Sequence, residues 1–171
     1  MAVTSGATDK VSVRPAAPAD MPAVGRLGAL LVAQHHDFDP DRFIPATGAT
    51  AAGYGGYLDS QRARPNVVIL VADSGGDVVG YTYAGLEGTD YMSLRGPAGV
   101  LYDLFVDPAR RREGIGRLLL EATAAELAAR GAPRLVLSTA ERNDLAQRLF
   151  ASAGFRRTMI EMTRELRADP G

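Results

Sequence analysis

A short apolar run, a proline and a glycine-containing loop lead into a predicted helix, and this succession could bind a phosphate group. The run Leu104–Val106 contains aromatic and β-branched residues, as a strand covered on both faces requires. Pro108 ends it, because proline donates no hydrogen bond to a sheet ladder. From Gly114 onward, apolar residues recur at helical spacing as far as Ala129. The loop therefore stands at the N-terminus of a helix that follows a buried strand.

The chemistry that this position favours is the binding of a pyrophosphate. Backbone N–H groups at a helix N-terminus have no intrahelical partners, and the helix dipole is positive there. Gly114 and Gly116 let an anion approach that backbone closely. A nucleotide P-loop is excluded because Gly-Lys-Ser/Thr is absent, and a dinucleotide fingerprint would need a glycine where Leu119 stands. A plain strand–turn–helix unit with solvated arginines explains the spacing equally well. The arginines are Arg111, Arg112 and Arg117.

Two blocks of the sequence resemble the GNAT N-acetyltransferase superfamily. The residues Arg111–Gly116, after Leu-Phe-Val-Asp-Pro, resemble the family's acetyl-CoA loop, Arg/Gln-x-x-Gly-x-Gly/Ala. The residues Asn143–Phe155 are similar to the family's Asn-x-x-Ala-x-x-Leu/Phe-Tyr-x-x-x-Gly-Phe, at the usual distance. The resemblance implies an enzyme that moves an acetyl group from acetyl-CoA to the primary amine of a small, cationic acceptor in a ternary complex. The alternatives are an acyl-CoA-binding or sensor module that has lost catalysis, and a protein N-acetyltransferase.

The order of strands and helices predicts an α/β (α+β) fold. The resemblance adds a mixed, mostly antiparallel sheet that splays after its fourth strand and is flanked by about four helices. It covers one domain, residues 11–167, between a flexible tail at 1–10 and a tail at 168–171. The expected strands are Val11–Arg14, Val67–Ala72, Val78–Ala84, Ala98–Val106 and Leu135–Ser138. The expected helices are one capped by Asp20, one over Ala46–Ser60, the helix from Gly114 and one over Asn143–Ala153, followed by an extended segment, Phe155–Leu166, of one or two strands.

The resemblance also assigns cofactor contacts residue by residue. The backbone of Leu104, Phe105 and Val106 would lie along the pantetheine arm, and the Val106 N–H would face the thioester carbonyl. Asn143 would hydrogen-bond the cofactor arm, although a plain helix N-cap is nearly as good an interpretation. The family's tyrosine acid is replaced by Phe150, which has no proton to give. The loop expected at the pyrophosphate consists of Arg111, Arg112, Glu113, Gly114, Ile115, Gly116 and Arg117.

The general base is harder to assign, because Tyr102-Asp103 stands where related diamine and aminoglycoside acetyltransferases often carry a glutamate. Asp103 is the nearest carboxylate, and strict alternation along a strand would point it to the face opposite Tyr102. Glu87, at the end of the preceding strand, is the other candidate. A structural aspartate and a solvated glutamate are the alternatives to these catalytic roles. Tyr102 itself could replace the missing acid.

A polar, proline-punctuated loop is predicted from His35 to Pro45, where this superfamily usually closes over the acceptor. Its aspartates would attract a cation, unless they form only a solvated acidic turn. Adjacent histidines point apart and no third ligand is fixed by spacing, so no metal site is expected. The expected acceptor contacts are His36, Asp37, Asp39 and Phe43 from this loop, together with Tyr83 from a strand; Asp41 belongs to the same acidic turn.

The composition is that of an ordinary globular protein. The chain has 171 residues, 46% of them hydrophobic, and a net charge of −1. This balance gives no sign of nucleic-acid or membrane-surface binding, and no apolar run approaches a membrane span. The first ten residues lack the features of a signal peptide, so a cytoplasmic location is expected. The absence of cysteine excludes disulfides and a cysteine-acyl intermediate. A homodimer is a tendency of the family.

Overall fold

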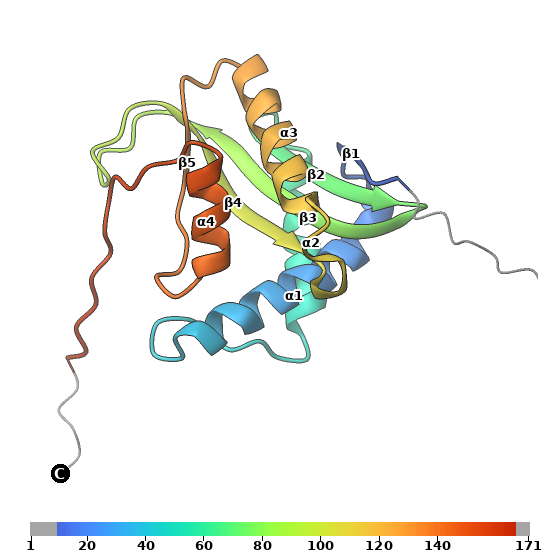
Figure 1. The fold of residues 1–171 in the computed structure, drawn as a ribbon, viewed down its shortest axis with the longest axis horizontal. Helices are drawn as coiled ribbons and strands as arrows, with labels where there is room; N and C mark the ends of the chain where they lie inside the picture. Colours follow the sequence, from blue (N-terminus) through green and yellow to red (C-terminus); the bar gives the residue numbers. More distant parts are fainter. Residues whose placement is uncertain (1–9, 167–171) are drawn as a thin grey trace, which may run out of the picture.

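The computed structural model describes residues 10–166, and in it a single five-stranded sheet separates two layers of helices (Figure 1). The strands are β1 (Ser12–Pro15), β2 (Val67–Ser74), β3 (Asp77–Glu87), β4 (Ala98–Val106) and β5 (Leu135–Leu137). The α-helices are α1 (Met21–Phe38), α2 (Thr50–Arg62), α3 (Ile115–Ala129) and α4 (Asp144–Ser152), and the 3-10 turns are η1 (Pro18–Asp20) and η2 (Pro108–Arg110). The predicted fold class is therefore confirmed.

The strands lie in sequence order, and the sheet opens between its last two members. Neighbouring strands from β1 to β4 pair antiparallel, whereas β4 and β5 pair parallel. That parallel pairing covers only three residues of β4, from Gly99 to Leu101. Beyond Leu101, the edge of β4 that faces β5 has no paired strand. The expected splay after the fourth strand is present, and residues 102–106 of β4 have no neighbouring strand on the β5 side in the described chain. We call this side of β4 the V-shaped opening.

Each face of the sheet carries its own apolar core, because side chains alternate along every strand. Helices α1 and α2 cover one face, with Val24 and Leu58 fully buried against it. Helices α3 and α4 cover the other face, with Leu119 and Phe150 in the core. The helical periodicity expected for α1, α3 and α4 is thus the periodicity of residues that face the sheet.

Glycines bring α1 and α2 unusually close together. A Cβ at Gly25 would lie 2.3 Å from the carbonyl oxygen of Ala51, and one at Gly28 would lie 2.2 Å from the ring of Tyr54. A Cβ at Gly55 would lie 2.8 Å from the carbonyl oxygen of Met21. Larger side chains at these positions would force the helices apart. The small residues therefore set where the ring of Tyr54 lies, and this ring reaches the candidate site.

Two expectations for the first helix are wrong. The helix does not end before His35 but runs to Phe38, so the predicted loop begins only at residue 39. Asp20 does not cap α1, because its carboxylate accepts hydrogen bonds from the Ala17 N–H and from Arg14. The ion pair with Arg14 offers this buried carboxylate a stronger partner than a backbone N–H group of α1.

The expected terminal strands are also absent. Residues 156–166 form no strand, and in Figure 1 this segment runs away from the sheet. Its apolar side chains are solvent-exposed, with Met162 at 90% and Leu166 at 88%. Most of the two predicted tails falls on residues 1–9 and 167–171, outside the described residues. Within residues 10–166, each helix is too short or too polar to span a lipid bilayer.

Candidate active site

The backbone of β4 presents to the V-shaped opening an N–H group that has no acceptor among residues 10–166. The N–H of Asp107 donates to the carbonyl oxygen of Val79 at 2.9 Å, which ties the end of β4 to β3. Successive N–H groups of a strand point in opposite directions within the sheet. The N–H of Val106 therefore points away from β3, toward the side where β5 has already ended at Leu137. A polarised carbonyl oxygen placed in the opening could accept a hydrogen bond from it.

Helix α3 begins at this same end of β4. Gly114 is its N-cap residue and has a left-handed backbone, with φ of 78°. The N–H of Leu118 makes the first intrahelical hydrogen bond, to the carbonyl oxygen of Gly114 at 3.0 Å. The N–H groups of residues 114–117 precede that bond and have no intrahelical acceptor. They form the donor set that a pyrophosphate requires.

Gly116 leaves room for a ligand at this helix N-terminus. A Cβ built at Gly116 would lie 3.4 Å from Leu149 and 3.8 Å from Val106, which is ordinary van der Waals contact. No protein atom forces a glycine here, so the missing side chain leaves space beside the free N–H groups. Ile115 is buried in the core, and so are its neighbours on the sheet side of α3. The residues present therefore fit a bound pyrophosphate and pantetheine arm.

The three loop arginines differ in how firmly they are held. Arg111 donates to Gln34 of α1 at 2.7 Å, and its guanidinium lies 5.4 Å from the centre of the Phe105 ring. Arg117 donates to Ser152 of α4 at 2.8 Å. Arg112 is exposed, has a positive φ of 68°, and makes no side-chain contact within residues 10–166. Arg112 is thus the most available of the three for a ligand phosphate.

The neighbouring positions of the loop and of the second sequence block are mainly structural in this conformation. Glu113 forms an ion pair with Arg110 at 2.9 Å, so it partly offsets the positive charge of the loop. Asn143 caps α4 by accepting from the Ala146 N–H at 3.2 Å, while its side-chain NH₂ group has no partner in the described part of the chain. The cap role and a cofactor contact through that NH₂ group are therefore compatible.

Phe150 and the first two cofactor residues of β4 contribute through packing as well. Phe150 is 8% exposed, and its ring centre lies 5.8 Å from that of Phe155. Phe105 is buried under α1, and Leu104 packs against the α3 side of the sheet. Their side chains thus hold β4 in place, and only their backbone is open to a ligand along the edge of the strand.

A bulge in β4 corrects the expected orientation of Asp103 and Tyr102. Tyr83 of β3 pairs with Asp103, but the next residue, Ala84, pairs with Leu101. Tyr102 is the extra residue, so strict alternation fails at this point. Both side chains face α2: Asp103 meets Tyr54, and Tyr102 packs against Tyr83 with ring centres 4.7 Å apart and ring planes tilted by 42°. A bulge brings two polar groups to one face where regular pairing would separate them.

Asp103 is a largely buried carboxylate held by phenols. It accepts a hydrogen bond from Tyr54 of α2 and another, of 3.2 Å, from Tyr81 of β3. Burial raises the pKa of Asp103 above its usual value, and the two hydrogen bonds act in the opposite direction. Burial likewise raises the pKa of Tyr54 and of Tyr81, so both stay protonated. No Arg or Lys in residues 10–166 pairs with Asp103.

Glu87 lies in a different environment. It accepts from the Tyr102 hydroxyl at 2.5 Å and forms an ion pair with Arg95 at 2.6 Å. Arg95 comes from the loop between β3 and β4, which is held by paired backbone hydrogen bonds between Asp90 and Arg95. Neither the Arg95 pair nor the contact of Tyr102 with Tyr83 was expected from the sequence, since each joins residues from separate elements.

Hydrogen bonds from His36 and Arg142 help to hold the expected acceptor loop in place. Nδ1 of His36 donates to the carbonyl oxygen of Phe43 at 2.8 Å, and Arg142 donates to the carbonyl oxygen of Phe38 at 2.6 Å. His36 thus fastens the loop to the end of α1. The side-chain carboxylates of Asp37 and Asp39 have no hydrogen bond or ion pair in the described chain, although the backbone of Asp39 is hydrogen-bonded to Arg42 and Phe43. In the same residues, no group of three potential metal ligands comes together.

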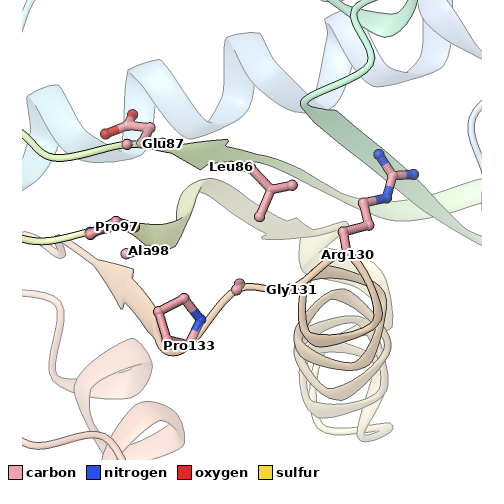
Figure 2. A pocket seen from close by; sticks show the side chains of 9 residues that line it. Leu86, Glu87, Pro97, Ala98, Arg130, Gly131 and Pro133 are labelled. Atoms are coloured by element: carbon pink, nitrogen blue, oxygen red, sulfur yellow. The ribbon is translucent and has the colours of Figure 1, made fainter.

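A cavity of about 270 Å³ lies at the opposite end of β4 from Val106. Figure 2 shows it between Glu87 at the end of β3, Ala98 at the start of β4, and the turn from Arg130 to Pro133. Val106 is eight residues further along β4, or about 26 Å at the rise of an extended strand. The cavity is therefore separate from the opening beside Val106.

Comparisons with known proteins agree with this geometry. The sequence profile of the Acetyltransferase (GNAT) family matches residues 32–155. A mycothiol acetyltransferase of Thermobispora bispora is 36% identical over 97 residues, which are 54% of this chain and 31% of that protein. The chain spans 31% to 45% of the length of the curated relatives that it matches.

Solved structures share the fold over nearly the whole chain. The BH1408 protein of Bacillus halodurans has a TM-score of 0.76 at 25% identity, covering 91% of this chain and 99% of that one. An aminoglycoside N-acetyltransferase in complex with CoA has a TM-score of 0.71 at 17% identity, covering 98% and 100%. With the profile match over most of its length, this chain belongs to the GNAT acetyltransferase family.

Proposed function

We propose that this protein transfers an acetyl group from acetyl-CoA to a primary amine of a small molecule by direct attack in a ternary complex. The observation that carries the proposal is the V-shaped opening beside β4, where the unpaired N–H of Val106 and the N-terminus of α3 lie at the same end. The relative named mycothiol acetyltransferase and the aminoglycoside N-acetyltransferase fold neighbour support a small-molecule acceptor.

The N-terminus of α3 would hold the pyrophosphate of the co-substrate. Its free N–H groups and the exposed Arg112 offer positive charge, and Gly116 leaves the space. The pantetheine arm would follow the open edge of β4, and the free side-chain NH₂ group of Asn143 would donate to it. When bound, acetyl-CoA supplies an activated acetyl group as a thioester.

The Val106 N–H would stabilise the negative charge that develops on the thioester carbonyl oxygen. A backbone N–H is fixed before the reaction, so it needs no reorganisation as the charge appears. Removing one donor of this kind costs about 2.7–4 kcal/mol in other enzymes. Val106→Pro removes this N–H without removing a ladder hydrogen bond to β3, because the N–H points away from that strand.

Asp103 is our choice for the proton acceptor. An alkylammonium has a pKa of about 10.4 and must lose a proton before it attacks. Asp103 has no arginine or lysine partner in residues 10–166, and burial raises its pKa above its usual value, which makes it a better proton acceptor. Glu87 is already held by Arg95 and Tyr102. The proton would pass to Asp103 directly or through one water.

Turnover with a panel of primary amines tests the proposal. The chain has no cysteine, so a thiol reagent measures released CoA without background from the protein. We expect measurable turnover, reduced about 10²–10³-fold in kcat by Val106→Pro with acetyl-CoA binding retained. Acetyl-CoA binding with no turnover above the uncatalysed rate for any amine would overturn the proposal and favour an acyl-CoA-binding module.

A further inference from the structure

Three tyrosines from three elements form a continuous row on the α2 side of the sheet. We call Tyr57, Tyr83 and Tyr102 the aromatic site. Their ring centres lie 6.3 Å apart between Tyr57 and Tyr83 and 4.7 Å apart between Tyr83 and Tyr102. Tyr57 is 52% exposed and Tyr102 is 41% exposed. The side chains of Tyr57 and Tyr102 therefore present surface to solvent, whereas Tyr83 is half-buried between them and the neighbouring ring of Tyr81 is fully buried.

The charges around the aromatic site favour a cation. Burial raises the pKa of Tyr83 and of Tyr102, so both phenols stay neutral at physiological pH. Glu87 and Arg95 cancel each other in charge, but Asp103 lies beside Tyr83 with no arginine or lysine partner in the described chain. The cation–π contacts found in residues 10–166 involve other rings. A ligand ammonium would thus meet the exposed parts of the Tyr57 and Tyr102 rings and the negative charge of the Asp103 carboxylate.

The aromatic site also lies within reach of the reacting centre. Tyr102 and Val106 are on the same strand, four residues apart, which is at most about 13 Å. An acceptor with its reacting amine at Val106 could therefore extend along β4 to the rings. The bulge makes this possible, because it turns Tyr102 to the same face as Asp103.

We propose that the aromatic site binds a second, cationic nitrogen of the acceptor, so that the preferred substrates are small molecules with two amino groups. This inference rests on the proposed function for the identity of the ligand as a substrate. The rings would hold one nitrogen as an ammonium, while the other nitrogen gives up its proton near Asp103. Binding at the rings sets the position of the reacting amine along β4.

Binding to the aromatic site can be measured without any acetyl transfer. Tetramethylammonium cannot be acetylated, and the six tyrosines of the chain can be labelled with 13C and assigned by single Tyr→Leu variants. We expect tetramethylammonium to shift the ring signals of Tyr57, Tyr83 and Tyr102. Tyr91, which is 78% exposed and outside the site, is the internal control. Equal shifts at Tyr91, or none at the three rings, would overturn the inference.

A pair of isosteric substrates tests the role in catalysis. One is an alkylamine that ends in a trimethylammonium group, and the other carries a neutral tert-butyl group in its place. We expect a KM about 3- to 30-fold lower for the charged substrate, with similar kcat. Tyr102→Leu should erase that difference and Tyr91→Leu should preserve it. A difference that survives in Tyr102→Leu contradicts the inference.

The two proposals fail in different ways. If neither substrate turns over, the proposed function fails, and the tetramethylammonium shifts still decide whether the aromatic site binds cations. If both substrates turn over with equal KM, the function stands and the inference is wrong. Tyr102→Phe guards against a folding artefact, because it keeps the ring and loses only the hydrogen bond to Glu87; it should retain the preference for the charged substrate.

Discussion

The phenol of Tyr54 donates a hydrogen bond to the carboxylate of Asp103, which lies 49 residues further along the chain. The contact joins α2 to the bulged part of β4 and sits next to the opening that we assign to the reaction. Gly28 of α1 leaves the space for the Tyr54 ring. The ionisation of the Asp103 carboxyl group therefore depends on Tyr54, and the position of Tyr54 depends on Gly28.

Tyr54→Phe is expected to change how the reaction depends on pH. Burial raises the pKa of Asp103, and the hydrogen bond from Tyr54 lowers it. When that hydrogen bond is lost, the pKa of Asp103 should therefore rise further. Because Asp103 must be ionised to accept a proton, the acidic limb of kcat/KM should move to higher pH. Asp103→Asn should remove that limb and most of the activity. Superimposable profiles for wild type and Tyr54→Phe would show that Asp103 is not the base.

Gly116→Glu is expected to abolish acetyl-CoA binding. The new side chain would place bulk and negative charge beside the free N–H groups of α3, and its Cβ meets only ordinary contacts. Acetyl-CoA at 100 times its dissociation constant should stabilise the wild type by about 2.7 kcal/mol, measured as a thermal shift. The matched control is Gly53→Glu, at an open position of α2. A full shift in Gly116→Glu would place the cofactor elsewhere.

Phe150→Tyr restores the phenol that the family carries at this position. We expect kcat to be equal or higher, by up to about 10²-fold, and a falling alkaline limb to appear. The wild type should lack that limb, because its thiolate leaves without help from residue 150. The ring is in the core, so an unpaired hydroxyl would also lower the free energy of unfolding by about 1–3 kcal/mol. A slower variant that is equally stable would contradict the assignment.

Asp20→Asn is expected to weaken the fold and flatten its acid dependence. The ion pair with Arg14 and the hydrogen bond from Ala17 hold the pKa of Asp20 below its ordinary value of 3.8. The stability that Asp20 contributes is therefore complete above that value and is lost as pH falls through the lower, folded pKa. At pH 7 the variant should lose about 1–3 kcal/mol, and the gap should close below pH 3.8 in urea titrations.

Removing residues 156–171 is expected to leave the fold intact. Residues 156–166 are exposed, and their side-chain contacts are the surface pairs Arg42–Glu161, Arg157–Gln147 and Arg157–Glu141. Exposed pairs of this kind contribute little, so the unfolding midpoint should change by less than about 3 °C. A larger decrease would mean that the segment stabilises the fold in solution, as an added strand would.

The sequence alone determined the elements that depend on local signals. The run that ends at Pro108, the glycines of the loop and the spacing after Gly114 predicted β4, the turn and α3, and the structure has all three. Turn and helix signals come from neighbouring residues, so one sequence suffices to recognise them. The second block likewise predicted α4 with Asn143 at its N-terminus.

Tertiary structure alone decided which side chains share a face and which segments meet. A bulge opposite Tyr83 turns Tyr102 and Asp103 to the same side, and it depends on how two strands pair, which alternation within one strand does not reveal. The contact of Tyr54 with Asp103 depends on how closely α1 and α2 pack. Asp20 accepts a hydrogen bond from the Ala17 N–H and does not cap α1, and this depends on its ion-pair partner Arg14, which belongs to another element. In each case the local sequence allows more than one arrangement of the side chain. Packing and hydrogen bonds with residues distant in the sequence decide between these arrangements, and those contacts exist only in the folded chain.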